Sequence, residues 1–220
     1  KNLESASQIT VLANTPSLND VIRRRPDVTS IKFNNYPFDS KKDTLFFSMI
    51  NLTNVTFINY SEEALNTILK MVSLKKSIRS VCINDSLLTS FPTSLHHFAH
   101  LDYLGLVNVR FTSILHKRGS LLTVDTLSLQ SDSLVLISPN IAKQFKIKSL
   151  YIIDSKFNDF PGGFEAMNNL KEIRLSSFPP EALKVMLQRI PEDNQIEHFS
   201  WINSTIRSIP ISISKLKNLK

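Results

Sequence analysis

Apolar residues recur along this chain with a period of 22 to 26 residues. When each unit is numbered from its first apolar position, positions 1, 4 and 6 are apolar in nine successive units. The units begin at residues 6, 28, 52, 78, 101, 124, 147, 170 and 196, and four consecutive units are 23 residues long. Self-similarity at a nearly fixed period is the sequence signature of a repeat architecture.

Each unit is predicted to contribute one short strand and one return crossover. Positions 4 and 6, which are often β-branched or aromatic as in Val55 and Phe57, indicate a strand with one buried face. One strand per unit requires a parallel sheet, because each crossover must return along the opposite side. Helical patterns occupy the crossovers of two 26-residue units, at residues 61–72 and 180–190. The first begins with an N-cap serine and the second with a proline.

Several units also contain a proline that is followed by spaced apolar residues. In the fourth unit these are Phe91-Pro92, Leu95 and Phe98, and the pattern returns in the seventh and ninth units. The units resemble leucine-rich repeats of the 23-residue kind, and the resemblance extends over residues 6–219. It implies an α/β fold: a curved horseshoe solenoid with a parallel β-sheet on its concave face and short helices, 3-10 turns and loops on its convex face.

The turn after each strand departs from that family's pattern. Leucine-rich repeats place an asparagine at position 9, where its side chain satisfies backbone groups of the turn. Only Asn14 follows this rule here. The other units hold Tyr36, Tyr60, Ser86, Val109, Asp132, Ser155, Phe178 and Ser204 at position 9. We therefore expect an irregular turn ladder and a locally uneven curve.

The amino-acid composition favours some classes of protein over others. With 42% apolar residues, the 220-residue chain can bury a long core, and its four glycines are too few to favour a phosphate-cradling loop. Cys82 is the single cysteine, so no internal disulfide can form and a reducing, cytoplasmic setting is favoured. No stretch is apolar enough to cross a membrane. We expect one domain, residues 1–220, cut from a longer chain because it begins without methionine.

The resemblance implies that a ligand binds the concave face, through the outward residues that alternate with the buried ones. The central column of that face, at position 5, consists of Thr10, Lys32, Thr56, Cys82, Gly105, Ser128, Tyr151, Arg174 and Ser200. Aromatic residues beside arginine are typical of interface centres, although single exposed apolar residues are also ordinary surface. We define the candidate binding patch as Tyr103, Lys148, Tyr151, Ile153, Lys171 and Arg174.

The net charge of +7 is compatible with a nucleic-acid partner. Acidic and basic residues nearly balance on the predicted strand face, however, so the excess must lie on loops and the convex side. It is divided among scattered groups such as Arg23-Arg24-Arg25 and Lys41-Lys42. Without a continuous basic stripe or interleaved aromatic residues, these groups indicate a solubilising surface, and nucleic acid is disfavoured as a partner.

Few residues suggest catalytic or metal-binding chemistry. His96 and His100 are four residues apart and would share a helical face on the convex side, but no neighbouring cysteine or carboxylate completes a metal site. No catalytic triad, glycine loop or spaced acid pair stands out, and a solenoid offers no deep pocket. We therefore expect no enzyme, no cofactor and no metal. Five Asn-x-Ser/Thr sequons occur, about as many as chance would produce, at Asn51, Asn54, Asn59, Asn84 and Asn203.

The sequence therefore predicts a protein-interaction module or scaffold of the kind used in signalling. Its partner is another protein, which lies across the concave face, and no small-molecule substrate is expected. Two alternatives stay open. The chain can be the ectodomain of a cell-surface or secreted recognition receptor, which the sequons favour, or a structural subunit of a large assembly.

Overall fold

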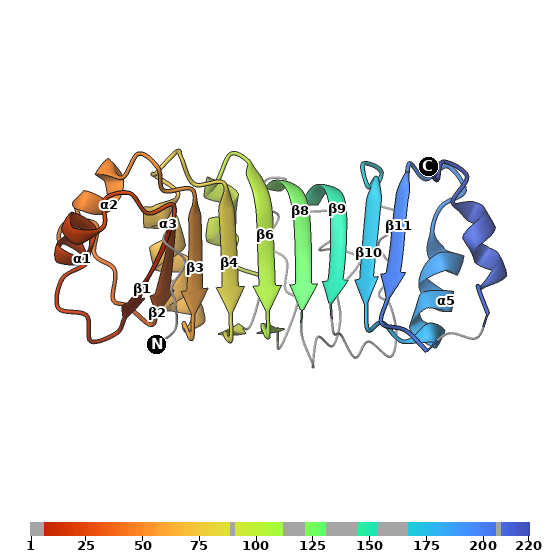
Figure 1. The fold of residues 1–220 in the computed structure, drawn as a ribbon, viewed down its shortest axis with the longest axis horizontal. Helices are drawn as coiled ribbons and strands as arrows, with labels where there is room; N and C mark the ends of the chain where they lie inside the picture. The colour runs from red at the N-terminus through yellow and green to blue at the C-terminus, as the bar shows by residue number, and fades with distance from the viewer. Residues whose placement is uncertain (1–6, 89–90, 112–121, 131–144, 154–166, 206–207) are drawn as a thin grey trace.

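A computed structural model of the protein describes residues 7–88, 91–111, 122–130, 145–153, 167–205 and 208–220. These residues form a long parallel sheet whose strands follow one another in chain order (Figure 1). Its nine strands are β1 (Gln8–Leu12), β2 (Ser30–Asn34), β3 (Asn54–Ile58), β4 (Ser80–Asn84), β6 (Leu101–Val107), β8 (Leu122–Gln130), β9 (Phe145–Ile153), β10 (Glu172–Ser176) and β11 (His198–Ile202). Each predicted repeat therefore supplies one strand.

Neighbouring strands pair in the register that the repeat predicts. Val81 of β4 is opposite Leu104 of β6, which is opposite Leu127 of β8. Leu150 of β9 and Ile173 of β10 continue the same row. Each position of one unit thus lies beside the same position of the next unit. Residues that are one repeat apart in the sequence consequently form continuous rows across the sheet.

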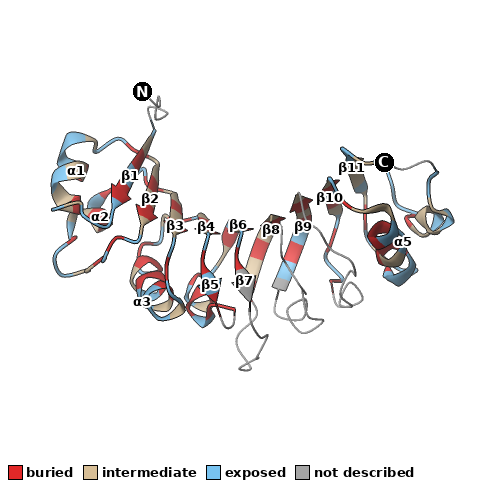
Figure 2. Cartoon of the chain, turned by 90° about the horizontal axis from the view of Figure 1, so that it is seen from below, coloured by how far each residue is buried: buried red, intermediate tan, exposed pale blue. Residues whose placement is uncertain are grey.

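The strands follow an arc, and the described crossovers lie on its outer side (Figure 2). The helices α1 (Leu18–Arg24), α3 (Glu62–Val72) and α5 (Pro180–Arg189) lie on that outer side. The crossovers also contain α2 (Leu45–Ser48), the short strands β5 (Leu87–Leu88) and β7 (Arg110–Phe111), and the 3-10 helices η1 (Thr93–His97) and η3 (Ile211–Lys215). The inner side of the sheet is open and forms the concave face.

Both predicted helices are confirmed. Ser61 caps α3, since its Oγ accepts a hydrogen bond from the backbone N–H of Ala64 at 3.4 Å. Pro180 is the first residue of α5, where a backbone N–H would have no intrahelical partner. The sequence did not predict α1, because seven residues are too few to show a helical period. No helix in the described ranges is long and apolar enough to cross a membrane.

The core runs between the sheet and the crossovers. Every described residue at repeat positions 1, 4 and 6 is buried except Phe199 and Trp201, which are partly buried on the edge strand β11. Fully burying one such side chain contributes about 1.5–3 kcal/mol, so these positions carry most of the stabilisation. Near the N-terminus the core is aromatic, and the ring of Phe33 stacks on that of Phe57 with centroids 5.8 Å apart.

The turn has the same backbone conformation after six of the strands, which corrects the expected irregular ladder for those repeats. Position 8 has positive φ, between 49° and 61°, at Asn35, Asn59, Asp85, Asn108, Ser177 and Asn203. The backbone N–H of this residue donates to the carbonyl of the last strand residue in the next repeat, as from Asn35 to Ile58 at 3.0 Å. The same bond links Asn59 to Asn84 and Asp85 to Val107. We call this feature the turn ladder.

Position 9, which the sequence predicted to be the polar turn position, is instead part of the core in five repeats. Tyr36, Tyr60, Ser86, Val109 and Phe178 are all buried there. The Tyr60 hydroxyl donates to the carbonyl of Tyr36 at 2.7 Å, and Ser86 Oγ accepts from the Tyr60 backbone N–H at 3.3 Å. The polar turn position is therefore position 8, one residue earlier than the sequence predicted. The sequence did contain a signal for this turn, namely the asparagine and aspartate residues at position 8. These residue types tolerate the left-handed conformation better than most residues.

Candidate functional site

Two residues of the candidate binding patch, Tyr151 and Arg174, lie side by side on the concave face. They are direct partners in the register between β9 and β10. The guanidinium carbon of Arg174 is 5.0 Å from the centre of the Tyr151 ring, which is a cation–π geometry. Arg174 keeps 59% of its side chain exposed, whereas Tyr151 is partly buried. The two side chains thus form one aromatic and cationic surface.

Glu172, which was not included in the patch, holds this pair in place. Its Oε1 accepts a hydrogen bond from Arg174 Nε at 2.6 Å, and its Oε2 accepts one from the Tyr151 hydroxyl at 3.2 Å. Burial would raise the pKa of Glu172, but hydrogen bonds from Arg174, Ser149 and Tyr151 outweigh it and lower the pKa. Burial, followed by the charge of Glu172, raises the pKa of Tyr151. The neutral phenol therefore remains a hydrogen-bond donor to an ionised carboxylate.

Lys148 and Lys171 lie on adjacent chain segments at the other end of the same strands. The backbone N–H of Lys171 donates to the carbonyl of Lys148 at 2.7 Å. Lys148 Nζ is 2.9 Å from Asp125 Oδ1, and Lys171 Nζ is 3.0 Å from Glu197 Oε1. Both lysine side chains are more than half exposed. The charges on this part of the face are therefore balanced in pairs, in keeping with the near-neutral face that the sequence predicts.

The remaining patch residues lie farther from Arg174. Ile153 is opposite Ser176, two positions along β9 from Tyr151, and is partly buried. Tyr103 is on β6, and β8 separates it from β9 (Figure 1). Its ring lies over Gly105, because a Cβ at that position would be 2.9 Å from the ring carbon Cε1 of Tyr103. Glycine at position 105 thus allows the tyrosine to lie across the central column.

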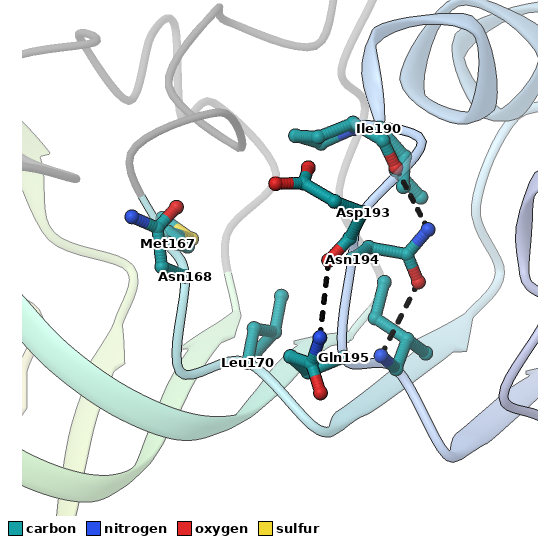
Figure 3. Close-up of a pocket in the computed structure, with 9 residues that line it drawn as sticks. Met167, Asn168, Leu170, Ile190, Asp193, Asn194 and Gln195 are labelled. Carbon is teal, nitrogen blue, oxygen red and sulfur yellow. Dashed lines mark hydrogen bonds between the residues drawn. The ribbon is translucent and has the colours of Figure 1, made fainter.

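We considered two hollows that are lined by described residues as sites for a small molecule. The first, of about 220 Å³, is lined by Met167, Leu170, Ile190 and others, and the Asp193 side chain extends into it (Figure 3). The second, of about 330 Å³, is an open depression lined by Leu12, Ala13, Asn14, Asn34, Asn35 and Asn59. Asp193 is the one titratable side chain among the described lining residues. Neither hollow therefore combines an acid with a base or a nucleophile.

The structure separates His96 from His100, which the sequence placed on one helical face. His96 lies in η1, where burial and then the charge of His97 lower its pKa. His100 directly precedes β6, and its Nε2 is 3.2 Å from Asp102 Oδ1 and 3.6 Å from Asp125 Oδ2. These carboxylates were not predicted as partners of His100, since Asp102 belongs to β6 and Asp125 to β8.

The sequon asparagines are unequally exposed. Asn51, Asn59 and Asn203 are exposed, whereas Asn54 and Asn84 are partly buried in β3 and β4. Asn84 Oδ1 also accepts a hydrogen bond from the Cys82 thiol at 3.0 Å. Three of the five side chains are therefore open to solvent.

The parallel sheet with one strand per repeat, the convex crossovers and the turn ladder define the fold as a leucine-rich-repeat solenoid. Among solved structures, a leucine-rich-repeat protein of Leptospira interrogans is similar, with 14% sequence identity and a TM-score of 0.39. The match covers 92% of this chain and 56% of that chain, so this chain spans little more than half of that protein's length. No protein-family model and no curated protein matches the sequence.

Proposed function

We propose that this chain is a protein-interaction module, without enzymatic activity, that binds a partner protein on its concave face. The observation that carries the proposal is the assembly of Tyr151, Arg174 and Glu172 on that face. Tyrosine and arginine are among the residues that most often dominate binding energy at protein interfaces. The proposed contact is centred on this pair.

The central column next to the pair consists of small residues. Ser128 is directly opposite Tyr151 on β8, and Gly105 follows in the same column on β6. Both residues are small and buried, and the ring of Tyr103 lies over Gly105. Crossovers lie on the other side of the sheet (Figure 2). A partner that binds here would therefore contact the partly exposed Tyr103 and Tyr151 side chains and Arg174.

The pair is also ordered before a partner arrives. Arg174 is fixed by Glu172 on one side and by the Tyr151 ring on the other. A side chain that is already held loses less conformational freedom on binding, which favours affinity. Lys148 and Lys171 form an exposed polar rim, and each has a carboxylate partner within the chain. An ordered aromatic centre within a polar rim is the usual anatomy of a protein interface.

The test compares partners of the wild-type protein with those of the Tyr151→Ala/Arg174→Ala double variant. Each protein is used as bait in quantitative affinity purification from its native source, and the recovered partner is then titrated in purified form. We expect the double variant to bind at least about tenfold more weakly, as for the loss of an interface centre. Arg24→Ala is the matched control, because Arg24 is exposed on α1 and should not affect binding.

Unchanged partner affinity in the folded double variant would contradict the proposal. Raising the salt concentration separates a protein partner from a phosphate-driven contact, since phosphate contacts weaken steeply with salt. We expect the affinity for the partner to survive this change. A steep loss with salt, with nucleic acid in the recovered complex, would instead support the nucleic-acid alternative.

A further inference from the structure

Three side chains with metal-binding atoms meet near the N-terminal ends of strands β6 and β8. They lie outside the proposed interface centre. The register between β6 and β8 pairs Leu101 with Val124 and Tyr103 with Thr126, which places Asp102 beside Asp125. His100 directly precedes β6. One ligand atom from each of the three residues lies within 4.8 Å of the other two. We call this group the edge cluster.

The distances within the edge cluster fit a bound metal ion. Zinc binds histidine nitrogen and carboxylate oxygen at about 2.0–2.2 Å, so two ligands in a tetrahedral or octahedral site lie about 3.0–3.6 Å apart. In the edge cluster, His100 Nε2 is 3.2 Å from Asp102 Oδ1 and 3.6 Å from Asp125 Oδ2. An ion can therefore reach the histidine and either carboxylate without a change in the backbone.

The surroundings orient the ligands and leave room for water. Lys148 Nζ contacts Asp125 Oδ1 at 2.9 Å, while the other oxygen, Oδ2, faces His100. Groups that hold the second oxygen of a ligating carboxylate commonly support metal sites in this way. About a third of the side chains of His100 and Asp125 is exposed, and Asp102 is exposed to 62%. Three protein ligands with open positions form a site that solvent can complete.

We propose that His100, Asp102 and Asp125 bind a divalent first-row transition-metal ion, with zinc as the ion to test first. One imidazole nitrogen and two carboxylate oxygens suit zinc, cobalt, nickel and manganese, and manganese binds such ligands most weakly in the first-row series. His100 ends one repeat, Asp102 belongs to the next, and Asp125 to the one after that. The ion therefore links adjacent repeats and stabilises their pairing.

The experiment is a titration of the untagged full chain, dialysed free of metal, with zinc by isothermal calorimetry. Cobalt is titrated in parallel, because its visible absorption reports the ligand geometry. We expect one saturable site with a dissociation constant on the order of micromolar, and a rise in melting temperature when zinc is added.

Variants locate the site. His100→Ala and Asp125→Asn should each weaken zinc binding by more than about tenfold and abolish the rise in melting temperature. His198→Ala is the matched control, because it removes an exposed histidine from β11 and should leave both measurements unchanged. Circular dichroism confirms that each variant is folded. Binding that survives His100→Ala, or no saturable zinc binding below millimolar concentrations, would overturn the proposal.

Discussion

At the scale of single residues, Cys82 shows how a thiol on the concave face can still be protected from chemical reaction. It belongs to the central column between Thr56 and Gly105, and its side chain is only partly exposed. Burial raises the pKa of the Cys82 thiol to about 11, although the charge of Lys32 opposes this effect. The thiol is therefore almost fully protonated at neutral pH, and only the thiolate is a good nucleophile.

We predict that Cys82 reacts with iodoacetamide at pH 8 at least about tenfold more slowly in the folded chain than in denaturant, because the folded thiolate fraction is so small. The rate in the folded protein should still rise through pH 9 and 10, since the thiol titrates near 11. Mass spectrometry of the alkylated peptide measures both rates. Equal rates in the folded and unfolded chains would show that the thiol is not protected.

At the scale of the repeat element, the turn ladder connects neighbouring repeats. Asn59 has a φ of 61°, and its Nδ2 donates to Asn34 Oδ1 in the preceding repeat at 3.2 Å. Its backbone N–H donates to Asn84 in the next repeat. One residue therefore connects three repeats. It can do so because asparagine accepts the left-handed conformation at a lower cost than most residues.

We predict that Asn59→Ala lowers the free energy of unfolding by about 1–2 kcal/mol, since alanine resists a positive φ. Asn59→Gly is the matched control: it also loses the side-chain hydrogen bond but adopts this φ without strain. Asn59→Gly should therefore lower the free energy of unfolding less than Asn59→Ala does. Chemical denaturation of the two variants beside the wild type measures the difference. If glycine were as destabilising as alanine, backbone strain would not be the reason for asparagine at this position.

At the scale of the whole molecule, the solenoid is unequally packed at its two ends. Near the N-terminus, Val55 and Phe57 of β3 are fully buried, whereas no described residue of β11 is. Ile202, Ile209 and Ile211 are exposed in the last repeat. Because each repeat of a solenoid contacts mainly its neighbours, a weak terminal repeat can open without unfolding the rest.

Ion pairs across the last repeats partly offset this weaker packing. Glu197 accepts hydrogen bonds from Lys220 and from Lys171, and these bonds lower its pKa to about 2. A carboxylate whose folded pKa is depressed stabilises the fold above the ordinary carboxyl range, and the contribution is lost as the pH falls towards the folded value. For Glu197 the loss therefore extends from about pH 4.5 down to about pH 2.

We predict that Glu197→Gln, which removes the charge at every pH, speeds amide hydrogen exchange in β11 and in residues 208–220. Exchange in β3 and β4 should be unchanged, because the N-terminal repeats do not depend on this end. Hydrogen-exchange mass spectrometry at neutral pH measures each segment, and Glu63→Gln is the control, since it removes an exposed carboxylate from α3 and should leave the last repeats unchanged. Uniform acceleration along the chain would mean that the solenoid opens as one unit.

Rows of residues across the sheet could be predicted because the repeat aligns them. Tyr151 and Arg174 share position 5, so their adjacency followed from the frame once the sheet was known to be parallel. The role of Glu172 could not be predicted with the same certainty. Its carboxylate joins Tyr151 and Arg174 only because particular side-chain conformations bring the three together. A repeat frame specifies neighbours, but it does not specify which polar atoms meet.

The sequence by itself determined the strands, their register and the two longer helices. Burial of one face of an element imposes a period on its apolar residues, and this period can be read from the sequence. The periodic apolar positions of β3 and β4 show this directly. Only the tertiary structure decided which residue takes the left-handed turn, which acids neutralise Lys148 and Lys171, and that His100 meets Asp125. These contacts depend on side-chain directions and on distances of a few ångströms between neighbouring repeats. No local pattern in a sequence encodes such distances.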